Sequence, residues 1–270
     1  MQFKSDYISL KGNVFSFNLD RTVSFRLVAP PNYRDSPTPF PVLLMNDGQD
    51  YVGLNLEKTL SDAYKDPKTI PFVFVGIEAD KNRLYEYGTS ISADFKGRGN
   101  KAFLYSKFII EEFVPFLCQE FKVSPPVQNW GFCGFSLGGL SAFDIVFNNS
   151  RVFGKVGVFS GSFWWRKKPY QKHDLKDRSR ITLDMIKYAD HKAPIQYFFQ
   201  CGTEEETDDR NNNGIIDVID DTMDVISELQ LKGYSYPGDI YYKEIEGGKH
   251  DLNTWSAVLP QFLKWAFQKS

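Results

Sequence analysis

The rest of this chain is organised around the residues Trp130-Gly131-Phe132-Cys133-Gly134-Phe135-Ser136-Leu137-Gly138-Gly139. It begins as a short apolar run with strand character and breaks into glycines around one serine. Beyond the serine the residues are small and favour a helix. A strand that turns sharply into a helix needs residues without a Cβ on both sides of the turn. The stretch therefore predicts a strand, a tight turn and a helix in direct succession.

Gly134-x-Ser136-x-Gly138 fits the G-x-S-x-G nucleophile elbow, a turn that holds a serine hydroxyl clear of the sheet. The same residues also fit a glycine-rich turn whose serine only caps the helix that follows. A motif this short does not decide between the two interpretations. The nucleophile hypothesis requires an acid and then a histidine later in the chain, because that is the order of this kind of triad.

Length and composition limit the classes of protein that need to be considered. The chain has 270 residues, of which 42% are hydrophobic and 24% charged, enough for one domain with a sizeable core. A net charge of −2 without a basic cluster argues against a nucleic-acid binder. No apolar segment is long enough to span a membrane, and the N-terminus lacks the apolar core of a signal peptide.

The cysteines indicate a reducing compartment. Cys118, Cys133 and Cys201 are odd in number and widely spaced, which favours free thiols in the cytoplasm over a disulfide framework. Cys133 and Cys201 lie in apolar, strand-like runs, so we expect both to pack in the core.

Six continuous apolar runs predict strands that are covered on both faces, as in a parallel sheet. They occupy residues 41–46, 71–77, 130–135, 155–160, 195–200 and 240–245. Between them, helical periodicity covers 103–121 with a kink at Pro115, 222–232 ending at Gly233, and 254–268 with Pro260 interrupting it. The alternation predicts one α/β domain over 1–270 with a mostly parallel sheet, preceded at 1–36 by antiparallel strands that include a hairpin at 14–28.

Histidine is scarce, so a catalytic histidine has few candidates. His250 lies in Glu246-Gly247-Gly248-Lys249-His250-Asp251, just past the sixth predicted strand. Active sites of open α/β folds form beyond the carboxyl ends of their strands, and the glycine pair gives this loop freedom to reach one. His173 and His191 are surrounded by charged residues, and we expect both at the solvated surface.

The acid should lie between the serine and the histidine. The fifth predicted strand is followed by Gln200-Cys201-Gly202-Thr203 and then by a cluster of carboxylates. Its candidates are Glu204, Glu205, Glu206 and Asp208. Position alone does not choose among them.

Taken together, the motifs resemble the esterase family of the α/β-hydrolase fold that includes enterochelin-esterase-like proteins, feruloyl esterases, S-formylglutathione hydrolases and mycobacterial mycolyltransferases. The resemblance covers roughly 20–268. It rests on Asp47-Gly48-Gln49, Arg83 with Glu86-Tyr87, Gly134 to Gly139, Ser160-Gly161-Ser162-Phe163, Gly202-Thr203, and Gly247-Gly248-x-His250 followed by Trp255. It implies an α/β-hydrolase fold, with a mostly parallel central sheet, helices on both faces and an N-terminal β-hairpin.

The resemblance also implies roles for residues. In relatives the acid often stands two positions after a Gly-Thr pair, which here is Glu205, with Glu206 next; this chain departs from the aspartate that is common there. Ser136 would be the nucleophile and His250 its base. The oxyanion would be bound by the N–H of Leu137 and, by resemblance, that of Gln49, with Gly48 as the second choice.

Three functions stay open at this point. The first is a serine carboxylic ester hydrolase that acts on a small-molecule ester and needs no cofactor for its chemistry. The second is an acyltransferase with the same triad, and the third is a non-catalytic, calcium-dependent binding scaffold. The sequence leaves the acyl group, the alcohol and the oligomeric state undetermined.

A second motif lies in the acidic loop. Counted from Asp209, oxygen-bearing side chains fall at positions 1, 3, 5, 9 and 12, with glycine at position 6, which is close to an EF-hand calcium loop and looks like its dockerin variety. The ligands would be Asp209, Asn211, Asn213, the carbonyl of Ile215, Asp217 and Asp220. The alternative is an Asn-rich surface turn in which Asp220 or Asp221 caps a helix that begins at Thr222.

Aromatic and charged residues near the predicted site have two interpretations each. Trp164, Trp165, Tyr85 and Tyr87 could form an aromatic platform for a substrate or simply cover the core. Arg83 and Glu86 could form an ion pair or touch the substrate.

Overall fold

A computed structural model describes residues 2–4, 7–126, 129–171, 177, 179–190 and 193–269. The surface positions predicted for His173 and His191 lie outside these residues. Among the residues described, no helix has the length and apolar character needed to cross a membrane.

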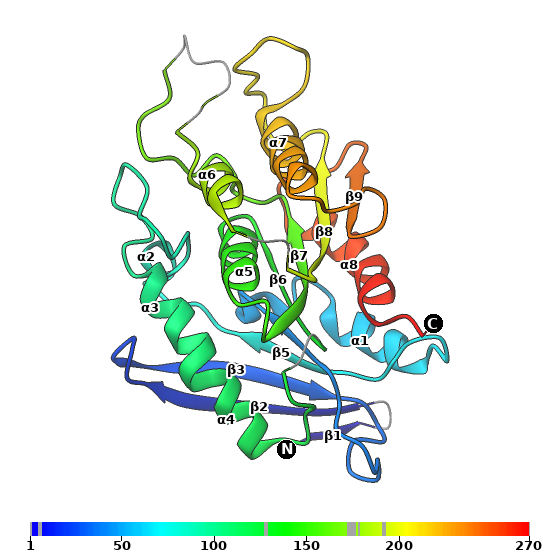
Figure 1. The fold of residues 1–270 in the computed structure, drawn as a ribbon. Coiled ribbons are helices and arrows are strands. Elements are labelled where there is room, and N and C mark those ends of the chain that lie inside the picture. Colours follow the sequence, from blue (N-terminus) through cyan, green and yellow to red (C-terminus); the bar gives the residue numbers. More distant parts are fainter. Residues whose placement is uncertain are drawn as a thin grey trace.

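The described strands form one nine-stranded sheet in the order β1-β2-β3-β5-β4-β6-β7-β8-β9 (Figure 1). Its strands are β1 (Gln2–Lys4), β2 (Tyr7–Ser16), β3 (Arg21–Ala29), β4 (Val42–Met45), β5 (Val73–Ile77), β6 (Trp130–Phe135), β7 (Phe153–Phe159), β8 (Gln196–Gly202) and β9 (Ile240–Ile245). β1, β2 and β3 pair antiparallel, and β3 joins β5 antiparallel. From β5 to β9 every pairing is parallel.

The six predicted core strands are confirmed as β4 to β9. The chain is buried throughout β4, β5 and β6, as continuous apolar runs covered on both faces require. The hairpin is also confirmed, but its strands are longer than the pattern indicated, because β2 begins at Tyr7 and β3 continues to Ala29.

Helices cover both faces of the sheet (Figure 1). They are η1 (Gly48–Tyr51), α1 (Leu56–Lys65), α2 (Arg83–Glu86), α3 (Ala102–Lys107), η2 (Phe108–Phe113), α4 (Val114–Glu120), α5 (Leu137–Asn148), α6 (Ile181–Tyr188), α7 (Asp217–Leu231) and α8 (Leu252–Phe267). One core packs α3 to α7 against the sheet, and a second core packs η1, α1 and α8 against the other face. Cys133 is fully buried in the second core and Cys201 in a small cluster beside α7, which confirms the packing expected of both.

The helix predicted over 103–121 is confirmed as α3, η2 and α4; η2 is a π-helical segment that ends just before Pro115, and its wider turn accommodates a ring that would otherwise clash with a carbonyl of the preceding turn. Two other helix predictions need correction. Pro260 does not interrupt α8, because it lies on the exposed side of the helix. α7 begins at Asp217 rather than Thr222, so neither Asp220 nor Asp221 is its N-cap.

Candidate active site

Ser136 occupies the sharp turn between β6 and α5. Its backbone has φ 51° and ψ −121°, a region that L-residues rarely adopt. A Cβ on Gly134 would lie 2.4 Å from the carbonyl oxygen of Gly138, so strand and helix pass too closely for any larger residue. The predicted strand, tight turn and helix are therefore confirmed.

Glu205 lies on the loop after β8 and faces the histidine. Its Oε2 is 2.8 Å from Nδ1 of His250, while its Oε1 accepts hydrogen bonds from the N–H of Gly202 and the hydroxyl of Ser160. The Glu205 side chain is only 1% exposed, whereas that of His250 is 39% exposed. The arrangement therefore buries the acid and leaves the imidazole at the edge of solvent.

The other candidate acids are engaged elsewhere. Oε1 of Glu206 accepts the N–H of Val218 in the first turn of α7, and burial raises the pKa of this carboxyl. Glu204 and Asp208 are exposed, and they contact their neighbours through the backbone, Glu204 with Gly248 and Asp208 with Asp217.

The loop that carries His250, after β9, contacts the loop that carries Glu205, after β8. A Cβ on Gly202 would lie 2.2 Å from the carbonyl oxygen of Gly248, so the two loops meet at glycine. The hydroxyl of Thr203 accepts the N–H of Gly247, which has φ 67°. Gly247 and Gly248 therefore let this loop extend to the site and also let it pass close to the loop that carries Glu205.

Ser136, Glu205 and His250 line one pocket of about 320 Å³. Ser160, Gly161, Trp164, Glu206 and Val218 complete its lining. Ser136 is half-buried, and its Oγ lies 3.4 Å from Oγ of Ser162. The structure thus brings together the three residue types that nucleophilic acyl transfer requires.

The predicted oxyanion donors lie at the beginnings of two helices. Leu137 is the first residue of α5, and Gly48 and Gln49 are the first residues of η1. The first N–H groups of a helix have no acceptor within it. The Gln49 side chain is occupied, since its amide donates to Asp47 and accepts the N–H of Ala79.

A buried network holds the loop before η1 against α5. The side chain of Asn46 donates to the carbonyl of Gly138 at 2.8 Å and accepts the hydroxyl of Tyr105 at 2.7 Å. Asp47, in a left-handed conformation, receives two hydrogen bonds from Arg83, at 2.7 and 2.8 Å. Burial opposes charge on Arg83, but the pairing with Asp47 outweighs it and raises the pKa of the guanidinium.

The sequence allowed an ion pair between Arg83 and Glu86, but the two residues bind other partners. Glu86 instead binds Arg21 through both carboxylate oxygens, at 2.9 and 2.6 Å. Asp47 and Arg21, the actual partners, lie 36 and 65 positions away, so the local sequence pattern did not indicate them.

The four aromatic residues divide between the two interpretations. Trp165 and Tyr87 are buried in the core. Trp164 lines the Ser136 pocket, with the guanidinium of Arg98 over its ring, and Tyr85 is 46% exposed.

Ser160 and Trp255 stood among the resemblance motifs without an assigned role. Nε1 of Trp255 donates to Oγ of Ser160 at 2.8 Å, and that hydroxyl donates to Glu205 at 2.6 Å. Ser160 and Trp255 are 95 positions apart, so no local signal in the sequence joins them.

The predicted calcium loop is folded around Asp220. The carboxylate of Asp209 accepts the N–H groups of Asn213 and Gly214, and the amides of Asn211 and Asn213 donate to Asp220. Gly214, at the predicted sharp turn, has φ 83°. Two other predicted ligands form no such cluster: Asp217 accepts the N–H of Arg210, and Ile215 is bound to Asn213 through its own N–H. Within the described ranges, no three His, Cys, Asp or Glu side chains are grouped to hold a metal.

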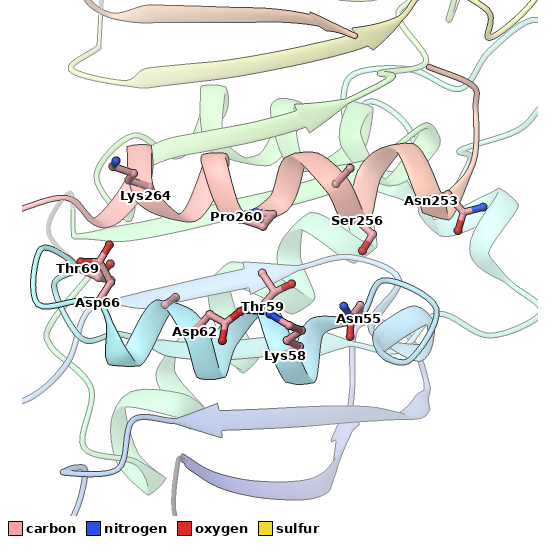
Figure 2. Close-up of a pocket in the computed structure, with 12 residues that line it drawn as sticks. Asn55, Lys58, Thr59, Asp62, Asp66, Thr69, Asn253, Ser256, Pro260 and Lys264 are labelled. Atoms are coloured by element: carbon pink, nitrogen blue, oxygen red, sulfur yellow. Dashed lines mark hydrogen bonds and ion pairs between the residues drawn. The ribbon is translucent and has the colours of Figure 1, made fainter. Parts of the chain in front are cut away.

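A larger groove of about 570 Å³ lies between α1 and α8 (Figure 2). Its lining side chains are mostly polar and come from the two helix surfaces, and Lys58 pairs with Asp62 one turn away. It contains no histidine or cysteine and no serine in a strained turn, so it offers no comparable nucleophile.

Comparisons with known proteins agree with this fold. A model of the family described as "Putative esterase" matches residues 16–266. An uncharacterized protein, YbbA of Bacillus subtilis (strain 168), is 32% identical over 145 residues, which are 52% of this chain and 57% of YbbA. The chain thus spans little more than half of that relative.

Two solved structures share the fold. A ferulic acid esterase superposes with a TM-score of 0.74 at 17% identity, covering 98% of both chains. The enterobactin esterase FES from Shigella flexneri, solved in the presence of enterobactin, gives a TM-score of 0.75 at 17% identity over 96% of this chain and 58% of that one.

Proposed function

This chain belongs to the "Putative esterase" family, and from that premise we propose that it is a carboxylic ester hydrolase with a Ser136–His250–Glu205 triad. The observation that carries the proposal is the buried carboxylate of Glu205, 2.8 Å from Nδ1 of His250, beside a pocket that Ser136 also lines. A buried acid that orients an imidazole next to a strained serine is the arrangement by which this chemistry is recognised.

In the proposed reaction Oγ of Ser136 attacks the ester carbonyl while Nε2 of His250 removes its proton. Glu205 holds the proton of the imidazole on Nδ1 and stabilises the imidazolium that forms. His250 then donates its proton to the leaving alcohol, which leaves an acyl-enzyme on Ser136. A water molecule, activated by the same imidazole, hydrolyses this ester and restores the serine.

The negative charge on the carbonyl oxygen is assigned to two backbone donors, the N–H groups of Leu137 and Gln49. The first belongs to the opening turn of α5 and the second to that of η1. Donors of this kind are fixed before the reaction begins and typically contribute about 3–4 kcal/mol each to the transition state.

The test is Ser136→Ala with a short p-nitrophenyl ester as substrate. We expect turnover to fall by a factor on the order of 10⁶, or to the detection limit, with an unchanged melting temperature. A fluorophosphonate probe should label the wild type and leave the variant unlabelled. Ser141→Ala, on the same helix, is the matched control and should keep both activity and labelling.

The alternatives correspond to distinct outcomes of these assays. Absence of labelling in the wild type would favour a non-catalytic scaffold. Labelling together with preferential transfer of the acyl group to an added alcohol would identify an acyltransferase. A panel of acetylated sugars, feruloyl esters and thioesters then defines the acyl group and the leaving group.

A structural Ca²⁺ in the loop 209–220 is a second part of the proposal. The side chains of Asp209, Asn211, Asn213 and Asp220 would hold the ion with the carbonyl of Ile215, and Asp217 would join through a water, as position 9 often does. The supporting observation is that the amides of Asn211 and Asn213 both face Asp220, since turning these amides presents oxygens in place of nitrogens. The ion would stiffen the loop that begins just beyond Glu205.

Calcium binding is tested by melting the protein in EGTA and in excess Ca²⁺. We expect a higher melting temperature with Ca²⁺ for the wild type and no response for Asp209→Ala. A wild type that melts at the same temperature in both conditions would exclude this part of the proposal and leave the triad unaffected.

A further inference from the structure

Ser160 is held in a strained conformation at the centre of the site. It follows β7 directly, is buried, and has φ 50°, a left-handed conformation that is unfavourable for serine. Its N–H donates to the carbonyl of Gln200 in β8, while the carbonyl of its neighbour Phe159 accepts the N–H of Ser136. The backbone of Ser160 is thus fixed between the nucleophile and the strand that leads to the acid.

The direction of the hydrogen bonds at Ser160 is determined by Trp255. An indole N–H can only donate, so Oγ of Ser160 must accept the bond from Nε1 of Trp255, at 2.8 Å. The single hydroxyl proton of Ser160 is then free to point at Oε1 of Glu205, 2.6 Å away. A hydroxyl that accepts one hydrogen bond donates the next one more strongly.

Glu205 receives this bond on the oxygen that does not face the histidine. Oε1 accepts the hydroxyl of Ser160 and the N–H of Gly202, at 2.5 Å, and Oε2 remains for Nδ1 of His250. Three partners in different directions fix both the position and the plane of a buried carboxylate.

Trp255 also contacts the histidine directly. Its ring lies edge-on to that of His250, with centroids 5.1 Å apart, and stacks on Phe135, the residue before the nucleophile. One indole therefore contacts the imidazole, packs on the strand that leads to Ser136 and donates to the residue that orients the acid.

We propose that Trp255 and Ser160 are positioning residues that act in series on Glu205 and, through it, on His250. The inference rests on the proposed function, because it assigns them a part in the same triad. Trp255→Phe keeps an aromatic ring and removes the donor, so the hydrogen bond from the Ser160 hydroxyl to Glu205 is weakened. Ser160→Ala removes the donor to the acid itself.

The experiment measures kcat, KM and their pH dependence for Trp255→Phe, Ser160→Ala and the double variant. Each single change removes or weakens one hydrogen bond to a charged group, so kcat should fall about 10- to 100-fold, with KM within about twofold. Because the two residues act in series, the double variant should be no slower than the slower single variant. With weaker support for the imidazolium, the acid limb of the kcat/KM profile should move to lower pH.

Trp265→Phe is the matched control, because this tryptophan lies on the same helix and packs against Phe198 and Phe262. It should keep the wild-type kcat and pH profile. If Ser160→Ala does not fold, Ser160→Gly removes the same hydroxyl and suits the left-handed backbone.

Two results would overturn the inference: single effects that multiply in the double variant, or an acid limb that stays in place while only the melting temperature falls. The first would show that the two residues act independently, and the second that they contribute to packing alone. Failure of the triad proposal itself is distinguishable, because the wild type would then not react with the fluorophosphonate.

Discussion

Two parts of the proposed site, the acid side at Glu205 and the oxyanion side at Asn46 to Gln49, are held by different kinds of interaction. On the acid side, neutral donors converge on one carboxylate, and that carboxylate faces the imidazole. On the oxyanion side, an ion pair between Arg83 and Asp47 and the side chain of Asn46 hold a stretch of backbone.

Because the interactions differ, mutations on the two sides should affect turnover differently. Loss of the Glu205 carboxylate itself disturbs the imidazole that moves the proton, so it should stop the reaction almost completely. A fault on the oxyanion side displaces one of two backbone donors, so it should slow the reaction and leave the rest of the machinery intact.

The largest effect on turnover is expected from Glu205→Gln. An amide at this position favours the wrong tautomer of His250, and kcat should fall by a factor on the order of 10⁴. Glu206→Gln is the matched control, because its amide oxygen can still accept the N–H of Val218, and it should stay within about threefold of the wild type. A larger loss in Glu206→Gln than in Glu205→Gln would reassign the acid.

The next effect is expected from Arg83→Met on the oxyanion side. Asp47, whose side chain is 4% exposed, would lose its cation, and the loop that carries Gln49 would shift. We expect kcat to fall about 100-fold, as when one oxyanion donor is lost. The measurement is kcat on the p-nitrophenyl ester beside the melting temperature.

Arg21→Met is the control for that variant. It breaks a similar bidentate pair, that of Arg21 with Glu86, and leaves the pair of Arg83 with Asp47 in place. We expect a loss of stability of about 3–5 kcal/mol with kcat nearly unchanged. An equal loss of kcat in Arg21→Met would show that Arg83 acts through general stability.

The sequence predicted the parts of this molecule that depend on neighbouring residues. Continuous apolar runs identified all six core strands, and parallel strands bring their carboxyl ends to one edge of a sheet. This is why the sequence alone placed Ser136, His250 and the acidic loop together. The glycines at 134 and 138 predicted the sharp turn for the same local reason.

Features that depend on distant partners were missed. α7 begins at Asp217 because Glu206, twelve residues away from Val218, caps it, whereas the local pattern suggested Thr222. The bonds from Trp255 to Ser160 and from Arg83 to Asp47 join residues 95 and 36 positions apart. Spacing in the sequence does not identify which residues pair at such separations, so these contacts became visible only in the three-dimensional structure.

A smaller effect is expected from Tyr105→Phe, which weakens the oxyanion side without removing a charge. The variant loses the hydroxyl that donates to Oδ1 of Asn46, and Asn46 still binds Gly138. We expect a stability loss of about 1 kcal/mol and a decrease in kcat of less than tenfold. Urea unfolding and the p-nitrophenyl assay measure the two quantities. A loss as large as that of Arg83→Met would show that Asn46, not the ion pair, sets the loop position.

No effect on turnover is expected from Asp144→Asn, which tests a buried carboxylate held by neutral donors. Asp144, on α5, accepts the N–H of Ser90 and an amide hydrogen of Asn148, yet burial raises its pKa from 3.8 to about 6. A carboxyl whose pKa is raised in the folded state is charged only at a cost, so wild-type stability should fall as pH rises from about 4 to about 6. Asparagine keeps an acceptor for Ser90 and removes this dependence.

The measurement for Asp144→Asn is the free energy of unfolding at pH 4, 5, 6, 7 and 8 for the variant and the wild type. The variant should gain stability relative to the wild type across pH 4–6, by about 1–3 kcal/mol, with a constant difference above that range. A difference that does not change with pH would mean that Asp144 titrates normally.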